Sequence, residues 1–223
     1  MEKAPRLLND DGSASMATIL LMSHHGFRRD LARFAAALKN VTAGDAARVP
    51  ALRDEWTWYH NALHGHHHME DSNIFPALLS RQTALAPIIE RLTGEHRHID
   101  PLLEQGDRAF ADLPASAVVA TRVVGELTAL LGEHLAREEA EVVPYLRGAK
   151  EFPAPGNDAD AAMYAQGFAW SSHGIAADVL DRVYAMLPES LTSRMPAARA
   201  AFDERCVRAW GSAAAGAAET AMP

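Results

Sequence analysis

The chain has 223 residues, of which 48% are hydrophobic and 22% are charged, which is the balance of an ordinary globular domain. Its formal net charge of −8 argues against nucleic acid as the main partner, because phosphate binding needs a basic face. The sequence contains no run of about 18 apolar residues that could span a membrane, and residues 1–11 lack the apolar core of a signal peptide. The single Cys206 excludes an internal disulfide. We therefore predict a cytoplasmic protein with no membrane partner.

Helix is favoured almost everywhere, because Ala is abundant and runs of β-branched residues are few. Residues 1–14 are expected to be a flexible leader, with a serine at position 13 or 15 capping the first helix. Pro76 and Pro144 are placed alike near the ends of the second and fourth helices, whose last turns they should kink or close. Four long helices are predicted, over about 15–39, 46–80, 87–111 and 115–147.

Four long helices with short connections predict an all-α, up-down-up-down bundle over residues 15–148. Residues 149–158 contain Pro and Gly and are expected to be a linker. A helical extension over 159–211 follows, with helices at about 159–186 and 196–210, and its apolar residues predict packing against the bundle. The Ala- and Gly-rich tail, 212–223, is expected to be disordered.

Two segments of the chain repeat one pattern 68 residues apart. His66 precedes Glu70 by four residues, and His134 precedes Glu138 by four. In both copies an acid follows the Glu directly and a Pro comes six residues after it. Residues four apart on a helix share a face, so each copy presents an imidazole and a carboxylate to one point. Two such pairs facing each other in a bundle predict a dinuclear metal site.

A histidine on the preceding helix accompanies each pair. His24 and His96 are each followed by apolar residues three and seven positions later, so the repeat extends to both helical hairpins. Four imidazoles and two carboxylates suit two borderline metal ions, which the carboxylates can bridge. His25 is an alternative to His24, but the repeat favours His24.

His67 breaks the symmetry of the repeat, because Leu135 is its counterpart in the second copy. On a helix His67 can face the same side as Glu70. One ion would then have three histidines and the other two, which leaves an open position for a small molecule. The alternatives for this fifth imidazole are His25, His60, His98 and His173.

Other polar and aromatic residues near these motifs have supporting roles in this interpretation. Asp71 and Glu139 point away from the ligand side and are expected to orient ligand imidazoles or to cap neighbouring helices. Core positions are expected for Trp56, Trp58 and Tyr59 rather than roles as redox partners, with Tyr59 also a possible phenol that shields the site.

The motifs over about residues 15–147 resemble those of the hemerythrin-like proteins, the HHE cation-binding family of bacterial non-haem di-iron bundles. The Arg-Arg-Asp-Leu after the first His pair and the His-His-x-x-Glu-Asp block resemble the longer, actinobacterial members. The resemblance implies two iron ions bridged by carboxylates and by an oxo or hydroxo group. The ligands it implies are His24, His66, His67, Glu70, His96, His134 and Glu138.

One position departs from the oxygen-carrying hemerythrins. Those proteins take two histidines, four residues apart, from the third helix, whereas Asp100 stands four residues after His96 here. The departure argues against reversible oxygen carriage and favours His67 as the fifth imidazole.

The resemblance implies a protein that binds or reacts with dioxygen, peroxide or nitric oxide in oxidative or nitrosative stress, or in redox sensing. It leaves open whether the chain is an enzyme, with catalase-like, peroxidase-like or NO-reducing activity, or a binding protein only. The alternatives are an iron sensor whose folding depends on metal, with the C-terminal helices as a partner surface, and a reversible oxygen carrier or store. Zinc or manganese in place of iron and a monomer or a dimer also remain open.

Overall fold

We describe the chain from a computed structural model, which describes residues 6–39, 41 and 48–211. Within these residues every regular element is a helix and no strand occurs, which confirms the predicted all-α fold. None of these helices is long and apolar enough to cross a membrane. The chain divides into two compact units, with Met1–Gly26 and Val142–Pro223 in unit 1 and Phe27–Glu141 in unit 2.

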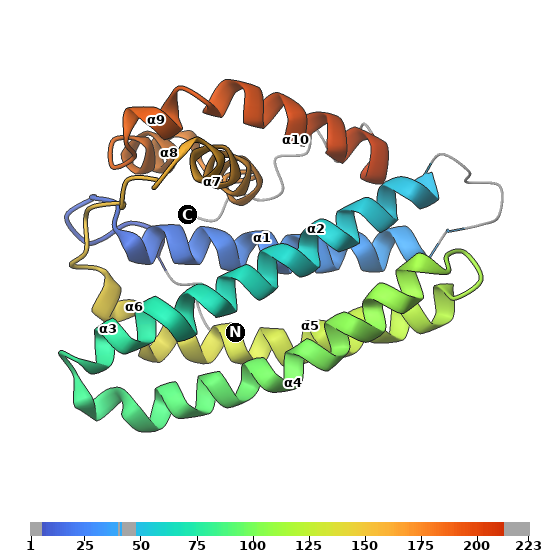
Figure 1. The fold of residues 1–223 in the computed structure, drawn as a ribbon, viewed down its shortest axis with the longest axis horizontal. Helices are drawn as coiled ribbons and strands as arrows, with labels where there is room; N and C mark the ends of the chain where they lie inside the picture. Colours follow the sequence, from blue (N-terminus) through green and yellow to red (C-terminus); the bar gives the residue numbers. More distant parts are fainter. Residues whose placement is uncertain (1–5, 40, 42–47, 212–223) are drawn as a thin grey trace. The chain divides into compact units, whose positions relative to one another are not determined.

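Unit 2 is a helical bundle. Its long elements are the second half of α1 (Met16–Leu38), α2 (Arg48–Met69), α4 (Ala86–Ala111) and α5 (Ala117–Glu141). Two short elements, η1 (Glu70–Ile74) and α3 (Phe75–Leu79), continue α2, and η2 (Thr83–Leu85) precedes α4. α4 packs against both α2 and α5 (Figure 1). α1 and α4 begin and end within one residue of their predicted positions. α2 and α5 begin within two residues of theirs but end at Met69 and Glu141, before the predicted ends at about 80 and 147.

Aromatic side chains fill the part of unit 2 that lies between α2 and α4. Trp56 stacks on Phe110 with ring centroids 4.4 Å apart, and Phe34 meets both Trp56 and Tyr59 edge-on. A Cβ at Gly106 would lie only 1.9 Å from Cζ2 of Trp56, so only glycine lets α4 pass this close to the indole. Trp56 and Tyr59 are 1% and 0% exposed, which confirms their predicted core positions.

Pro76 changes the helix before it in a way that the sequence pattern did not specify. Proline has no N–H to donate and its ring clashes with the carbonyl four residues earlier. The helix widens at this point into the π-helical turn η1, in which the Phe75 N–H donates a hydrogen bond to the Glu70 carbonyl, five residues earlier. At Pro144 the helix instead ends, at Glu141, and restarts as α6 (Val143–Leu146). π-turns occur often at functional sites, and this one begins at a predicted metal ligand.

Unit 1 contains the first half of α1, then α6, and the C-terminal helices α7 (Asp158–Ser171), α8 (Ala177–Tyr184), α9 (Glu189–Thr192) and α10 (Met195–Trp210). The chain therefore has additional C-terminal helices after those of the bundle, as predicted. Gly26 provides the space for Trp170, since a Cβ there would lie 2.6 Å from the indole. Residues before α1 are also held in unit 1, where the Thr18 hydroxyl donates to the Leu7 carbonyl over 2.8 Å.

The prediction of one helix over about 159–186 is wrong. α7 ends at Ser171 and α8 begins at Ala177, because Gly174 has φ of +85° between them. This left-handed conformation is open to glycine at little cost and cannot continue a helix. The predicted tail, 212–223, and residues 1–5 of the predicted leader lie outside the described residues.

Candidate metal centre

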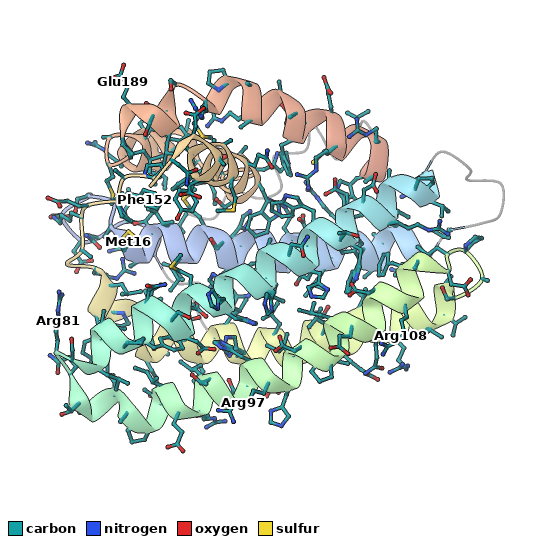
Figure 2. The ribbon with its side chains drawn as sticks, in the orientation of Figure 1. Met16, Arg81, Arg97, Arg108, Phe152 and Glu189 are labelled. Atoms are coloured by element: carbon teal, nitrogen blue, oxygen red, sulfur yellow. The ribbon has the colours of Figure 1, made fainter. Side chains whose placement is uncertain are left out.

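Four elements of unit 2 bring four predicted ligands to one point. His67 on α2, Glu70 at the start of η1, His96 on α4 and His134 on α5 each offer an atom within 4.8 Å of the others. We call these four residues the His67 group. All four side chains are buried, whereas Arg97 and Arg108 on the same helix as His96 are exposed (Figure 2). Nitrogen and oxygen ligands bind a divalent metal ion such as zinc at about 2.0–2.2 Å, so one ion could contact all four side chains.

Glu70 also belongs to a second set of ligand atoms. His66, Glu70 and Glu138, which we call the His66 group, likewise lie within 4.8 Å of one another. Oε1 of Glu70 is 2.9 Å from Nε2 of His66, and Oε2 is 3.4 Å from Nε2 of His96. Each carboxylate oxygen thus faces a different group. This is the arrangement that a carboxylate needs to bridge two ions about 3.5–4 Å apart.

The imidazole rings of the His67 group are fixed by packing against one another. His67 stacks on His96 with centroids 4.0 Å apart, and His96 meets His134 at 4.9 Å. Phe75, in the helix turn that follows η1, lies parallel to His96 on an apolar side of the ring. Leu135, which occupies the position matching His67 in the second repeat, is fully buried. The second repeat therefore has an apolar core residue at the position where the first repeat has the imidazole of His67.

Asp71 orients the ring of His96. Its Oδ2 lies 2.9 Å from Nδ1 of His96, while its Oδ1 accepts a hydrogen bond from the Thr93 hydroxyl over 2.7 Å. Burial on its own would lower the pKa of His96, but the carboxylates of Glu70 and Asp71 outweigh it, and the pKa is raised. Asp71 accepts the Nδ1 proton, and a metal ion at this point would take the place of the proton on Nε2, the ring nitrogen that faces Glu70.

Glu95 does the same for His134. Its Oε2 accepts from Nδ1 of His134 over 3.1 Å, and its other oxygen accepts from Arg137. Burial raises the pKa of Glu95, but the hydrogen bond from His134 and the charge of Arg137 prevail and lower it. Burial also lowers the pKa of His134 to about 4, so this imidazole is neutral near pH 7.

Nε2 of His134 indicates whether these residues suit a metal ion. Its Nε2 is buried and has no hydrogen-bond partner among the described residues, while Nδ1 is committed to Glu95. Buried polar atoms are nearly always satisfied, and a cation at this point would satisfy it. The carboxylate–histidine arrangement is also the usual environment of a metal-bound imidazole. The donor set of imidazoles and carboxylates therefore fits a divalent iron-like ion.

Replacing Glu95 by Ala should weaken metal binding about 10–100-fold, because partners of this kind contribute that much to affinity. The variant removes the hydrogen bond that fixes His134 but leaves every proposed ligand in place. Competition with a chelator of known affinity, followed by metal analysis of the protein, measures the change. Glu90→Ala is the matched control, since Glu90 is an exposed carboxylate on the same helix; equal affinities in the two variants would contradict the role of Glu95.

The other histidines weighed from the sequence occupy distinct places. His24 is buried on the part of α1 that belongs to unit 1, and its place among the ligands stays a prediction. His25 Nε2 instead bonds the backbone carbonyl of His173, within unit 1. His60 bonds Asp107 over 2.9 Å. His98 is exposed.

Two charged residues have roles that sequence reasoning missed or left open. Glu95 directly precedes His96 and pairs with a histidine on another helix; its only sequence signal is that adjacency. Glu139 accepts a hydrogen bond from Arg28, the first of the two arginines that follow His24 and His25, and this pairing was not expected from the sequence.

Comparison with curated proteins and comparison with solved structures give no significant match. A comparison with protein families does give one. The hemerythrin HHE cation binding domain matches residues 15–146, more than half of the chain and a stretch that includes all seven predicted ligands. The chain therefore belongs to the hemerythrin HHE cation-binding family.

Proposed function

We propose that this protein is a non-haem di-iron protein that binds or reacts with dioxygen, peroxide or nitric oxide in oxidative or nitrosative stress or in redox sensing. The observation that carries the proposal is the position of Glu70, whose two oxygens face two different histidines, His66 and His96. A single ion would not need a carboxylate that is shared by two ligand groups. Two ions bridged by Glu70 would use both oxygens.

In this proposal the two ligand groups differ in kind. The His67 group supplies three imidazoles and one carboxylate, whereas the His66 group supplies one imidazole and two carboxylates. His24 is the proposed additional ligand of the His66 group; the sequence repeat and its burial support this. The ion with fewer imidazoles is then the place where a small molecule binds. When bound, iron supplies the electrons for chemistry with dioxygen, peroxide or nitric oxide.

The chain's own residues hold the ligands and limit access of water. Phe27 packs against the His66 ring with centroids 5.1 Å apart, and Phe75 lies along His96. Asp71 and Glu95 keep the Nδ1 protons of their imidazoles in place. A dry pocket of fixed ligands strengthens the interaction of iron with an anionic or polar small molecule. The cytoplasmic location belongs to the same proposal and rests on the sequence expectation.

An iron-sensing module is the second candidate function. Glu70 and Glu138 are both fully buried, and their carboxylates lie within 4.8 Å of each other. A fold that buries two such groups side by side gains stability when cations bind between them. This coupling between metal and fold is what a metal-dependent regulator needs. Reversible oxygen carriage has no comparable observation in its favour.

The test begins with metal analysis of the full chain loaded anaerobically with ferrous iron. Two irons per chain are expected. The ferrous protein is then mixed with oxygenated buffer and followed by stopped-flow absorption from about 300 to 600 nm, where iron–ligand charge-transfer bands fall. A lasting band that reverses when oxygen is removed would indicate a carrier, and a transient band or direct passage to a ferric spectrum would indicate oxidation or sensing. A flat spectrum without bound iron would overturn the proposal.

A further inference from the structure

A surface cavity of about 410 Å³ lies in unit 2 between α2 and α4. Its lining includes Arg53, Trp56, His60, Asp107 and Phe110. Trp56 is only 1% exposed, yet it forms part of this lining, so an edge of a core indole borders the surface. The cavity contains none of the proposed metal ligands. It therefore needs an explanation separate from the metal centre.

Trp56 is held firmly with its N–H directed at a carboxylate. The indole stacks on Phe110, with 8° between the ring planes, and lies against Gly106, where no side chain intervenes. Its Nε1 donates to Oδ1 of Asp107 over 2.9 Å, and His60 Nδ1 lies 2.9 Å from the same oxygen. The Asp107 side chain is 46% exposed. The indole N–H thus has a proton acceptor that is itself open to water.

A continuous series of rings leads from this indole to the metal centre. Trp56 and Tyr59 are stacked with centroids 5.7 Å apart. Tyr59 meets Phe27 at 5.8 Å, and Phe27 meets the proposed ligand His66 at 5.1 Å. Each ring contacts the next within the 4.5–7 Å range of aromatic pairs. No step in the series leaves unit 2.

We propose that Trp56 is an electron donor to the metal centre, with Asp107 as the acceptor of the indole proton. The inference rests on the proposed di-iron function. Hydrogen peroxide is the oxidant: its O–O bond breaks as it takes two electrons from the iron pair and two protons from solvent, which gives two molecules of water. One electron then passes from the Trp56 indole through Tyr59 and Phe27 to the oxidised centre, which is reduced by one electron. The N–H bond of the indole breaks, its proton goes to the Asp107 carboxylate, and a neutral tryptophan radical remains.

The cavity gives this radical a way to be repaired. Asp107 and the indole edge both line it, so a small organic one-electron donor such as an enediol can approach from solvent. The donor returns one electron to Trp56 and Asp107 returns the proton. The Trp56 indole is then restored. One oxidising equivalent has moved from the buried metal centre to the external donor without damaging the metal ligands.

Tyr59 transmits the electron but does not hold the radical. Its hydroxyl is buried and has no hydrogen-bond partner among the residues that the structure describes. Burial and the negative charge of Asp30 raise the pKa of Tyr59 well above its usual value. A phenol without a proton acceptor is difficult to oxidise to a neutral radical, since the proton has nowhere to go. Trp56, with Asp107 beside it, is the more stable end of the path.

The experiment is freeze-quench electron paramagnetic resonance on the iron-loaded full chain mixed with hydrogen peroxide. The wild type should give a tryptophan radical, recognised because its signal narrows when the protein contains ring-deuterated tryptophan. Trp56→Phe should lose at least about nine-tenths of this signal. Trp58→Phe is the matched control, because Trp58 is a half-buried tryptophan on the same helix that has no part in the proposed path, and it should keep the signal.

A second variant guards against misfolding, since Trp56 is a core residue. Asp107→Asn keeps a hydrogen-bond acceptor at a half-exposed position but cannot take the proton. Its neutral radical should fall at least about tenfold, and peptide mass spectrometry should find less oxygenated Trp56 after repeated peroxide treatment. If the protein binds iron and peroxide oxidises it, yet no tryptophan radical forms or Asp107→Asn leaves it unchanged, the inference is wrong. If no iron binds, the proposed function itself fails.

Discussion

Glu70→Gln should remove both iron ions from the protein, whereas Glu138→Gln should remove one. Glu70 contributes an oxygen to each ligand group, while Glu138 belongs to the His66 group alone. A neutral amide is a poor ligand and cannot balance the charge of two dications. The loss at each affected site should exceed the roughly 10–100-fold that an outer hydrogen-bond partner contributes. Metal analysis after gel filtration gives the stoichiometry directly.

The graded outcome of these two variants is what identifies a bridge. Asp54→Asn is the control for the loss of one negative charge, because Asp54 is exposed on α2, the helix that η1 continues. This variant should keep both ions. If Glu70→Gln retains one ion as tightly as Glu138→Gln does, Glu70 serves one ligand group only and does not bridge two ions. The ion left in Glu138→Gln should be the one bound by His67, His96 and His134.

Much of this centre follows from the sequence because helix geometry is regular. Two residues four positions apart on a helix always share a face. The sequence alone therefore predicted that His66 lies beside Glu70 and that His134 lies beside Glu138. Each pair is also preceded by a histidine on the helix before it, and this likeness related His96 to the second pair. The same regularity placed His67 on the ligand side, and the structure brings it within 4.8 Å of Glu70, His96 and His134.

Other parts depend on contacts between distant segments, which no local pattern contains. The hydrogen bond of Glu95 to His134 joins residues 39 positions apart on two helices, and nothing in the pattern around Glu95 marks it. Pro76 and Pro144 each indicated a distorted helix, but the sequence did not specify whether the helix would break or widen into a π-turn. The helix widens into a π-turn before Pro76 and breaks before Pro144. The break at Gly174 was also missed, because a single glycine inside an amphipathic pattern is often tolerated.

Removing the metal should destabilise the wild type but not the double variant Glu70→Gln/Glu138→Gln. Two ionised carboxylates within 4.8 Å repel each other by about 3 kcal/mol at an effective dielectric constant of about 20, unless one of them takes up a proton. Without metal, the double variant should therefore be more stable than the wild type by about 1–3 kcal/mol. With metal at about 1,000 times its dissociation constant, each site should stabilise the wild type by about 4 kcal/mol.

Urea denaturation followed by circular dichroism, with iron and with chelator, measures all four free energies of unfolding. The control is Glu90→Gln/Glu133→Gln, which removes two exposed carboxylates from the same bundle and should respond to chelator as the wild type does. A double variant that iron still stabilises would contradict the assignment of both ligands. The wild type also separates the two functions: loss of most helix on chelation indicates a sensor whose fold depends on metal. A modest shift of the midpoint with helix retained indicates a di-iron protein whose aromatic and aliphatic core is sufficient to fold, so that the buried carboxylates serve the iron rather than the fold.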